Sequence, residues 1–322
     1  MKKTTISYVI PVYNSEKTIS KVIFDIISAI NNSKKYDYEI ILVNDYSKDD
    51  VLSIVLNIAH ENKKIKIINF SKNFGQHAAI IAGLRVAKGQ IAVCLDDDGQ
   101  TPPIESIKLI KAIENGYDIA YAKYNNKKHS TFRNFGSLLN DKMANWLLNK
   151  PDDLFISSFF ACKEFVIKEI IKYNNPYPYM QGLALRTTNN IVNVDIDHKE
   201  RTNGKSNYSF KKLISLWFNG FTAFSVKPLR VSSFIGFSFS IFGFIYGVIL
   251  IIKKLMNKTQ ILGYSSIMAS LLFIGGIIMI ILGLIGEYLG RIYICINQSP
   301  QYVIKETYNI KHDEKHKTKN NK

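Results

Sequence analysis

The stretch Ala92–Pro103, AVCLDDDGQTPP, joins an apolar run to three consecutive carboxylates. Apolar residues without a polar break are typical of a strand buried on both faces of a parallel sheet. A pair of prolines then marks the start of a helix, since proline fits the first helical turn. The carboxylates Asp96, Asp97 and Asp98 therefore lie where a buried strand ends. In an α/β sheet, this is the edge at which ligands bind.

Strands and helices are expected to alternate on both sides of this stretch. Each expected strand is a short, continuous apolar run, and each expected helix has apolar residues three or four positions apart. This pattern predicts an α/β domain whose mostly parallel sheet is covered by helices on both faces. The expected strands are 7–12, 38–43, 65–70, 90–95 and 117–121, and the expected helices are 18–30, 50–59, 76–87 and 104–113.

Polar side chains follow the expected strands at their carboxyl ends. Because these ends meet at one edge of a parallel sheet, the side chains are expected to converge on one site. Such convergence is stronger evidence for a ligand site than any single motif. The residues are Tyr13, Asn14, Asp45, Asn73, Asp96, Asp97, Asp98 and Lys123.

Within the acidic stretch, Asp96 and Asp98 form an Asp-x-Asp pair on one side of the extended chain, and Asp97 points to the other. Adjacent carboxylates repel each other by about 1 kcal/mol per pair at 4 Å in water. A divalent cation would offset this repulsion, and Mg²⁺ or Mn²⁺ prefers carboxylates, waters and substrate phosphates. An acidic turn before a helix is the alternative interpretation. The expected proximity of Asp45 favours the metal site.

Two common nucleotide-binding motifs are absent from the sequence. No Gly-x-Gly-x-x-Gly follows the first expected strand, and no Gly-x-x-x-x-Gly-Lys-Ser/Thr occurs. These absences argue against a dinucleotide oxidoreductase and a P-loop enzyme. The net charge of +16 indicates an anionic partner. Because the positive charge is spread along the chain without a nucleic-acid motif, no nucleic-acid partner is expected.

Two uncharged apolar stretches lie near the C-terminus, at about 232–252 and 265–285. Each is about as long as a helix that crosses a bilayer core of roughly 30 Å. Together they predict a transmembrane hairpin rather than two buried core helices, since uncharged runs of this length are uncommon in soluble domains. Lys227, Arg230 and Arg291 favour flanking segments in the cytoplasm, although three lysines in the connecting loop oppose this orientation.

Six motifs occur in order along the chain. They are VIPVYNSEKTI, EIILVNDYSKDD, SKNFGQHAAIIAGL, LDDDGQTPP, GYDIAYAKY and HKERTNGKSNYSFKKL. With the two apolar stretches, they resemble the family 2 glycosyltransferases, which have a GT-A fold. The resemblance is closer to the polyisoprenyl-phosphate branch, which includes dolichyl-phosphate mannose synthases and undecaprenyl-phosphate glucosyl and formamidoarabinosyl transferases. It covers nearly the whole chain up to about residue 296.

The resemblance implies an organisation in four parts and a multi-pass protein of the cell membrane. The parts are a cytoplasmic GT-A domain (1–206), amphipathic juxtamembrane helices (207–230), two transmembrane helices (231–290) and a cytoplasmic basic tail (291–322). The aromatic residues and flanking lysines of the second part are typical of helices that lie in the membrane interface.

The resemblance also implies roles for single residues. Nucleotide-sugar contacts are expected from Pro11, Tyr13, Glu16, Asp45, Asp96, Asp97, Asp98 and Gln100, with Asp97 acting through its backbone. Phosphate and acceptor contacts are expected from Lys123, Arg133, Arg201, Lys205 and Ser206. Asp96 and Asp98 would hold Mg²⁺ or Mn²⁺, and the residues expected to act in catalysis are Asp96, Asp98, Arg201 and Lys205.

The implied reaction is an inverting transfer of a sugar from a nucleotide sugar, UDP in preference to GDP, to a polyisoprenyl phosphate at the cytoplasmic leaflet. It would serve cell-envelope glycan modification. Because a phosphate monoester is ionised near pH 7, a general base is not essential. Two alternatives stay open: transfer to a saccharide hydroxyl, which needs a base, and a catalytically silent membrane assembly protein. The resemblance also allows a homotetramer.

Two positions depart from the family pattern. Ser15 stands where relatives often have Glu, and Glu16 comes one residue later. Ser158 stands where relatives often have an Asp that has been suggested as a base. These departures leave the sugar, the nucleotide and the need for a base open.

Overall fold

The computed structural model describes residues 3–124, 151, 153–197 and 263–310, together with isolated positions between 229 and 256. The chain divides into two compact units. Unit 1 comprises Met1–Tyr208 and Ser299–Lys322, and unit 2 comprises Ser209–Gln298. Unit 1 is therefore built from two parts of the chain that are distant in sequence.

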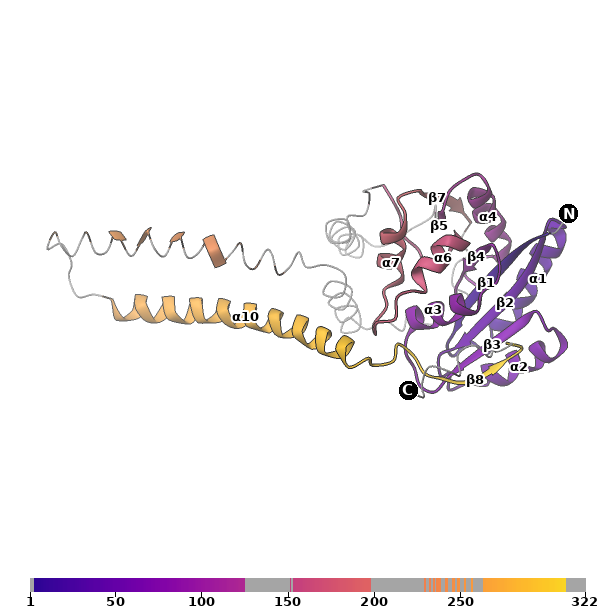
Figure 1. Cartoon of the computed structure of the whole chain (residues 1–322), viewed down its shortest axis with the longest axis horizontal. Coiled ribbons are helices and arrows are strands. Elements are labelled where there is room, and N and C mark those ends of the chain that lie inside the picture. Colours follow the sequence, from indigo (N-terminus) through magenta and orange to yellow (C-terminus); the bar gives the residue numbers. More distant parts are fainter. Residues whose placement is uncertain are drawn as a thin grey trace, which may run out of the picture. The chain divides into compact units, whose positions relative to one another are not determined.

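Unit 1 contains a sheet with helices on both faces (Figure 1). The strands are β1 (Thr4–Val12), β2 (Tyr36–Asn44), β3 (Ile65–Phe70), β4 (Ile91–Cys94), β5 (Ile119–Tyr124), β6 (Phe160–Lys163), β7 (Ile191–Ile196) and β8 (Ile304–Tyr308). The helices are α1 (Ile19–Ser33), α2 (Val51–Glu61), α3 (Gln76–Val86), α4 (Ser106–Glu114), α6 (Glu164–Ile170) and α7 (Met180–Thr187), with a 3-10 turn η1 (Pro103–Glu105) before α4.

The centre of the sheet is parallel, and two strands run in the opposite direction. Across the sheet the order is β7-β5-β6-β4-β1-β2-β3-β8. The parallel pairs are β1 with β2 and β4, β2 with β3, and β5 with β7. The antiparallel strands are β6, which pairs with β4 and β5, and β8, which pairs with β3. The predicted α/β class with a mostly parallel sheet is confirmed, but β6, β7 and β8 are not among the strands expected from the sequence.

The central strand β1 is buried on both faces, which explains its continuous apolar run. Its residues Ile6, Tyr8 and Ile10 belong to a core that also contains apolar residues of α1, α2 and α4. On the other face, Val9 contacts α3, where a Cβ atom on Gly83 would lie 2.4 Å from Val9 Cγ1. A larger residue at position 83 would therefore push α3 away from the sheet.

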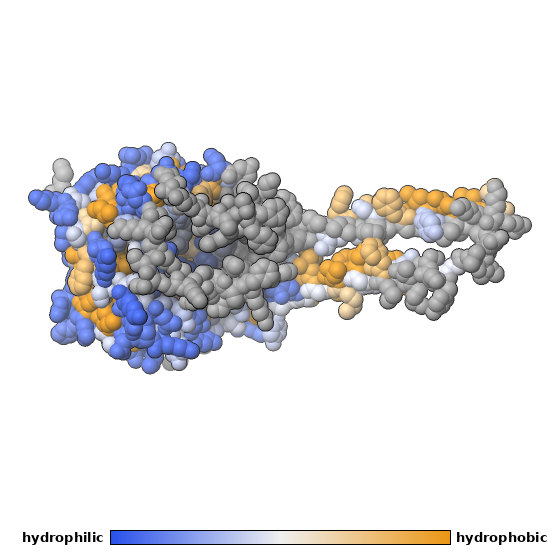
Figure 2. All heavy atoms as spheres, turned by 180° about the vertical axis from the view of Figure 1, so that it is seen from behind, coloured by the Kyte–Doolittle hydropathy of each residue, from blue (hydrophilic) through white to orange (hydrophobic). Residues whose placement is uncertain are grey.

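Unit 2 contains α10 (Tyr264–Ile296), a helix of 33 residues. Its segment Phe273–Ile296 is the one helical segment among the described residues that is long and apolar enough to cross a membrane. Figure 2 shows apolar side chains along the exposed surface of this helix. The first predicted span, 232–252, has only isolated described positions.

The structure differs from the predicted basic tail at two places. Residues 291–296 continue α10, where Arg291 forms an ion pair with Glu287 one helical turn earlier. Further on, β8 adds an edge strand to the sheet of unit 1. The polar sequence of β8 was not recognisable as a strand, because the strand is largely exposed and its pairing partner β3 is distant in sequence.

Tyr302 anchors this C-terminal segment to unit 1. Its ring stacks on Phe70 with the ring centroids 5.1 Å apart, and Arg85 Nη1 donates to its hydroxyl at 2.7 Å. The backbone N–H of Ser71 donates to the carbonyl of Val303 at 3.0 Å. The end of β3 is thus held by residues that follow the membrane-length helix.

We predict that Tyr302→Ala lowers the free energy of unfolding of unit 1 by about 2 kcal/mol, because an aromatic pair and a cation–π contact are lost. Tyr302→Phe keeps the ring and removes only the hydroxyl, so we expect a loss of about 1 kcal/mol. Denaturant unfolding of the full-length chain in detergent measures both values. Equal losses in the two variants would show that the ring itself contributes nothing.

Candidate active site

The expected ligand site lies at the edge of the sheet where β1 to β4 end (Figure 1). Pro11 lies in β1 opposite Val43 of β2 and is buried. The backbone nitrogen of residue 11 lies on the β4 side of β1. The pairing of β1 with β4 stops before this position, at Val9 and Cys94. Proline therefore costs no sheet hydrogen bond at this position.

The loops after β1 and β2 are tied together by hydrogen bonds. Asn14 N–H donates to Ser47 Oγ at 3.1 Å, and Glu16 N–H donates to Asp49 Oδ2 at 2.9 Å. In return, Asp50 N–H donates to Glu16 Oε2 at 3.2 Å, just before α2 begins. Glu16, which we expected to contact the nucleotide sugar, thus has a structural partner at the start of α2.

Asp45 joins the end of β2 to the loop between β3 and α3. Its two carboxylate oxygens accept the backbone N–H groups of Phe74 at 2.6 Å and Gly75 at 2.8 Å. Asn73 Nδ2 also donates to the carbonyl of Asp45 at 3.1 Å. Burial raises the pKa of Asp45, although the two N–H donors oppose this rise. The expected convergence of Asp45 and Asn73 is therefore present.

Asp96 is held in place by two side chains from other parts of the chain. Gln76 Nε2, at the start of α3, donates to Asp96 Oδ1 at 2.6 Å, and Ser158 Oγ donates to Asp96 Oδ2 at 2.5 Å. Burial raises the pKa of Asp96, and the nearby charge of Asp98 raises it further. Ser158 thus orients a carboxylate, a role that no local sequence pattern indicated.

Asp97 ties the end of β4 to the loop after β1. Its Oδ2 accepts the backbone N–H of Tyr13 at 2.9 Å, and its carbonyl accepts the hydroxyl of Thr18 at 2.7 Å. Burial raises the pKa of Asp97 to about 6. We expected Asp97 to contact the nucleotide sugar through its backbone, and its side chain has a separate, structural partner in the backbone N–H of Tyr13.

Of the remaining expected residues, some lie near this edge of the sheet and four lie outside the described part of the chain. Asp98 accepts the backbone N–H of Gln100 at 3.0 Å, and Gly99 between them has a φ of 69°, which favours glycine. Lys123 is exposed near the carboxyl end of β5. Four of the expected residues lie outside the described part of the chain: Arg133, Arg201, Lys205 and Ser206.

Asp96 and Asp98 are the two carboxylates that we expect to hold a divalent cation. No group of three or more potential ligands from His, Cys, Asp and Glu occurs within the described ranges. Mg²⁺ at phosphate-transfer sites needs only one or two carboxylates, because waters and substrate phosphates complete its coordination. Two hydrogen bonds orient Asp96, and burial together with the charge of Asp98 raises its pKa. A bound cation would oppose this rise in pKa.

Residues 7–171 match the family model described as glycosyl transferase family 2. The chain belongs to this family. It is therefore a glycosyltransferase, as the resemblance implied. Residues 227–292 match a second model, the GtrB C-terminal hairpin. The second match agrees with the predicted pair of apolar helices after the α/β domain.

Relatives of this family member match over almost the entire chain. The undecaprenyl-phosphate 4-deoxy-4-formamido-L-arabinose transferase of Proteus mirabilis is 31% identical over 317 residues, and the match covers 96% of both proteins. The SfII prophage-derived bactoprenol glucosyl transferase of Shigella flexneri is 33% identical, with 94% of this chain and 98% of the relative covered. The sequence similarity therefore extends over nearly the whole length of each protein.

A solved structure supports the fold of the glycosyltransferase. Glucosyl-3-phosphoglycerate synthase from Mycobacterium tuberculosis, in complex with Mn²⁺ and UDP-glucose, matches with a TM-score of 0.51 and 17% sequence identity. The match covers 67% of this chain and 76% of that protein. The GT-A fold expected from the sequence is confirmed.

Proposed function

We propose that this glycosyltransferase moves a sugar from a nucleotide sugar, UDP in preference to GDP, to a polyisoprenyl phosphate at the cytoplasmic leaflet of the cell membrane. The observation that carries the proposal is a carboxylate-lined sheet edge in the same chain as an apolar helix of membrane length. Two relatives named for undecaprenyl phosphate and bactoprenol match at least 94% of this chain.

Tyr13, Tyr46 and Asp45 are the groups we assign to the nucleoside. Tyr13 is 45% exposed and Tyr46 is 50% exposed, and both follow strands that end at the site edge. Exposed aromatic rings can stack on a nucleobase. The carboxylate of Asp45 accepts hydrogen bonds, and a uracil N–H or a ribose hydroxyl offers one. Pro11 would support this wall from within β1.

The diphosphate of the donor would lie beside Asp96 and Asp98. When bound there, Mg²⁺ or Mn²⁺ supplies positive charge to the leaving nucleoside diphosphate. The hydrogen bonds from Gln76 and Ser158 hold the Asp96 carboxylate in a fixed orientation, which limits reorganisation during the reaction. We assign Lys123 and Arg133 to the same phosphates and Gln100 to the sugar.

The acceptor needs no proton transfer, because a phosphate monoester is already ionised near pH 7. One of its oxygens forms a bond to the anomeric carbon while the bond from that carbon to the diphosphate oxygen breaks. A single displacement of this kind inverts the anomeric centre, as in family 2. Ser158 donates to Asp96 where relatives often have an acid, and this agrees with a reaction without a base. Acceptor binding is assigned to Arg201, Lys205 and Ser206.

The topology of unit 1 supports two membrane crossings. Its sheet contains strands from before and after the apolar region, since β8 pairs with β3. Both parts must lie on the same side of the membrane, and this requires an even number of crossings. A hairpin of 231–290 with spans at about 232–252 and 265–285 satisfies this condition, and it follows interfacial helices at 207–230. The flanking basic residues then favour a cytoplasmic domain. A homotetramer is our expectation from the resemblance alone.

The decisive experiment uses the full-length protein in detergent with Mg²⁺ or Mn²⁺, undecaprenyl phosphate and a panel of UDP- and GDP-sugars. We expect release of the nucleoside diphosphate with one donor, and loss of release when a chelator removes the metal. Release with a saccharide acceptor alone would favour the alternative acceptor class. Absence of release with every donor and both acceptor classes would contradict the proposal.

We predict that Arg201→Ala raises the KM for undecaprenyl phosphate about 10- to 100-fold, the equivalent of one charge-assisted hydrogen bond. The KM for the donor should stay near that of the unchanged protein. Steady-state kinetics with varied lipid phosphate measures the effect. For Arg201→Lys, the KM for undecaprenyl phosphate should lie between the values of Arg201→Ala and the unchanged protein. Lys21→Ala, on the exposed side of α1, serves as control. An unchanged KM for the lipid would refute the role of Arg201.

A further inference from the structure

A basic pocket opens at the amino ends of the parallel strands of unit 1, near the start of β3. Its volume is ≈ 420 Å³, within the range of small-molecule sites. Its polar wall consists of Lys63, Lys66, Arg85, Lys88 and Asn309. The site carboxylates follow the carboxyl ends of the parallel strands, so this pocket is separate from the candidate active site.

Three segments of the chain form the basic pocket. Lys63 precedes β3, and Lys66 lies within it. Arg85 lies in the last turn of α3, and Lys88 follows that helix. Asn309 follows β8, and its Nδ2 donates to the carbonyls of Ala59 and Ile65. The pocket is therefore completed only when the C-terminal segment returns to the sheet.

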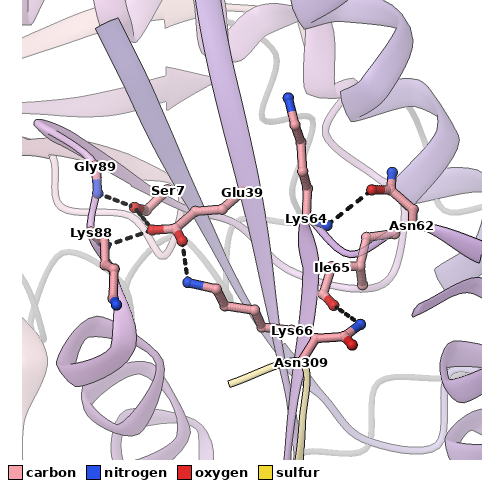
Figure 3. Close-up of polar contacts among 9 residues, drawn as sticks. All are labelled: Ser7, Glu39, Asn62, Lys64, Ile65, Lys66, Lys88, Gly89 and Asn309. Carbon is pink, nitrogen blue, oxygen red and sulfur yellow. Dashed lines mark hydrogen bonds and ion pairs between the residues drawn. The ribbon is translucent and has the colours of Figure 1, made fainter. Parts of the chain in front are cut away.

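A single buried carboxylate, Glu39, neutralises one of the four cations. Its side chain pairs with Lys66 Nζ and accepts the hydroxyl of Ser7 at 2.6 Å and the backbone N–H of Lys88 at 2.5 Å (Figure 3). These contacts occupy both carboxylate oxygens. Glu39 therefore fixes two walls of the pocket but compensates only the charge of Lys66.

The other three cations lack a carboxylate partner within the described ranges. Arg85 donates to neutral acceptors, namely the hydroxyl of Tyr302, the carbonyl of Tyr173 and Oδ1 of Asn174. These bonds hold the guanidinium without cancelling its charge. Lys63 and Lys88 are exposed, and neither forms an ion pair with a described residue. Three residues whose positive charge has no carboxylate partner among the described residues thus line one pocket.

We propose that the basic pocket binds a phosphate-bearing anion. A phosphate group carries a charge of about −1.5 to −2 near pH 7, and binding would relieve the repulsion among the three cations. Lysine ammonium groups donate to phosphate oxygens, and Asn309 adds a polar wall. The apolar residues Val86 and Ile310 also line the pocket and could contact an organic group attached to the phosphate. The source is a soluble phosphate compound or the headgroup of an anionic lipid.

The test measures the reactivity of pocket lysines in the full-length protein, with saturating UDP and Mg²⁺ present to occupy the proposed donor site. An amine-acylating reagent and peptide mass spectrometry report on Lys63 and Lys88, with the exposed Lys21 as internal reference. One arm adds pyrophosphate to the detergent-solubilised protein and compares it with potassium chloride at equal ionic strength. The other compares nanodiscs of phosphatidylcholine with nanodiscs that also contain phosphatidylglycerol.

At a ligand concentration ten times the Kd, we expect the reactivity of Lys63 and Lys88 to fall about tenfold, while Lys21 stays unchanged. Protection by pyrophosphate identifies a soluble phosphate source, and protection by phosphatidylglycerol alone identifies a lipid headgroup. Both outcomes support the pocket. Unchanged reactivity of both lysines in both arms would overturn it.

A pair of double variants tests the same proposal through thermal stability. Lys63→Gln with Lys88→Gln should abolish the stabilisation by whichever ligand protects the lysines. Lys21→Gln with Lys111→Gln removes the same charge from exposed helix positions and should retain that stabilisation. Equal stabilisation of the two double variants would show that binding occurs elsewhere, and would therefore overturn the proposal.

Discussion

Asp98→Asn is expected to lower the turnover of the full-length enzyme by on the order of 10³-fold, since metal-assisted charge stabilisation is worth several kcal/mol. The substitution keeps the size of the side chain and an oxygen that can accept the N–H of Gln100. It removes the negative charge that, with Asp96, makes this edge suitable for a divalent cation. The fold should therefore be retained while the reaction is lost.

Release of nucleoside diphosphate at saturating donor and undecaprenyl phosphate measures this effect. Asp25→Asn, at an exposed position of α1, makes the same change in charge away from the site and should leave turnover unchanged. Thermal unfolding of Asp98→Asn should match that of the unchanged protein. Turnover near the original value would show that Asp98 takes no part in binding a metal or a diphosphate.

Glu39→Gln is expected to lower the free energy of unfolding of unit 1 by about 3 kcal/mol, the low end for breaking a buried ion pair. The side chain of Glu39 is only 9% exposed, and that of its partner Lys66 only 13%. The substitution leaves the Lys66 ammonium in this setting without a counter-charge. The hydrogen bonds from Ser7 and from the Lys88 backbone also weaken, because the acceptor becomes neutral.

The effect of Glu39→Gln should depend on pH. Burial by itself would raise the pKa of Glu39, but the hydrogen bonds from Lys66, Ser7 and Lys88 lower it below its usual value of 4.5. Because the pKa is lower in the folded state, the ionised group stabilises the fold above pH 4.5, and this contribution is lost as the pH falls through the folded pKa. The difference between the variant and the unchanged protein should therefore narrow in acid.

Denaturant unfolding at neutral pH and at pH values below 4.5 measures this difference. Glu114→Gln is the matched control, since Glu114 pairs with the exposed Lys35, whose side chain is 62% accessible. An exposed pair contributes less than about 1 kcal/mol. Equal losses in the two variants, or a difference that widens in acid, would contradict the role assigned to Glu39.

The central fold and the main site edge could be predicted from the sequence. Strands β1 to β4 are largely buried on both faces, so each contains a run of mainly apolar residues, and such runs are visible without a structure. Asp45 and Asp96 follow these runs directly. Because the carboxyl ends of parallel strands lie at one edge of the sheet, the position of both residues at this edge could be predicted from the strand pattern.

The tertiary structure decided which side chains hold these carboxylates. Gln76 and Ser158 meet Asp96 from α3 and from the segment before β6, and neither has a local pattern that indicates this contact. Asp97 similarly found its partner, the N–H of Tyr13, in another loop. Such pairs depend on sheet register and helix packing, which join residues that are distant in the chain.

The α/β class, the parallel centre of the sheet and the acidic edge could all be predicted from local sequence, because burial on both faces of a strand leaves a local apolar signal. The return of β8 to β3, and the basic pocket that it completes, depend on contacts between distant parts of the chain. β8 is polar and largely exposed, so its position depends on backbone pairing and on the Tyr302 anchor rather than on its own hydrophobicity.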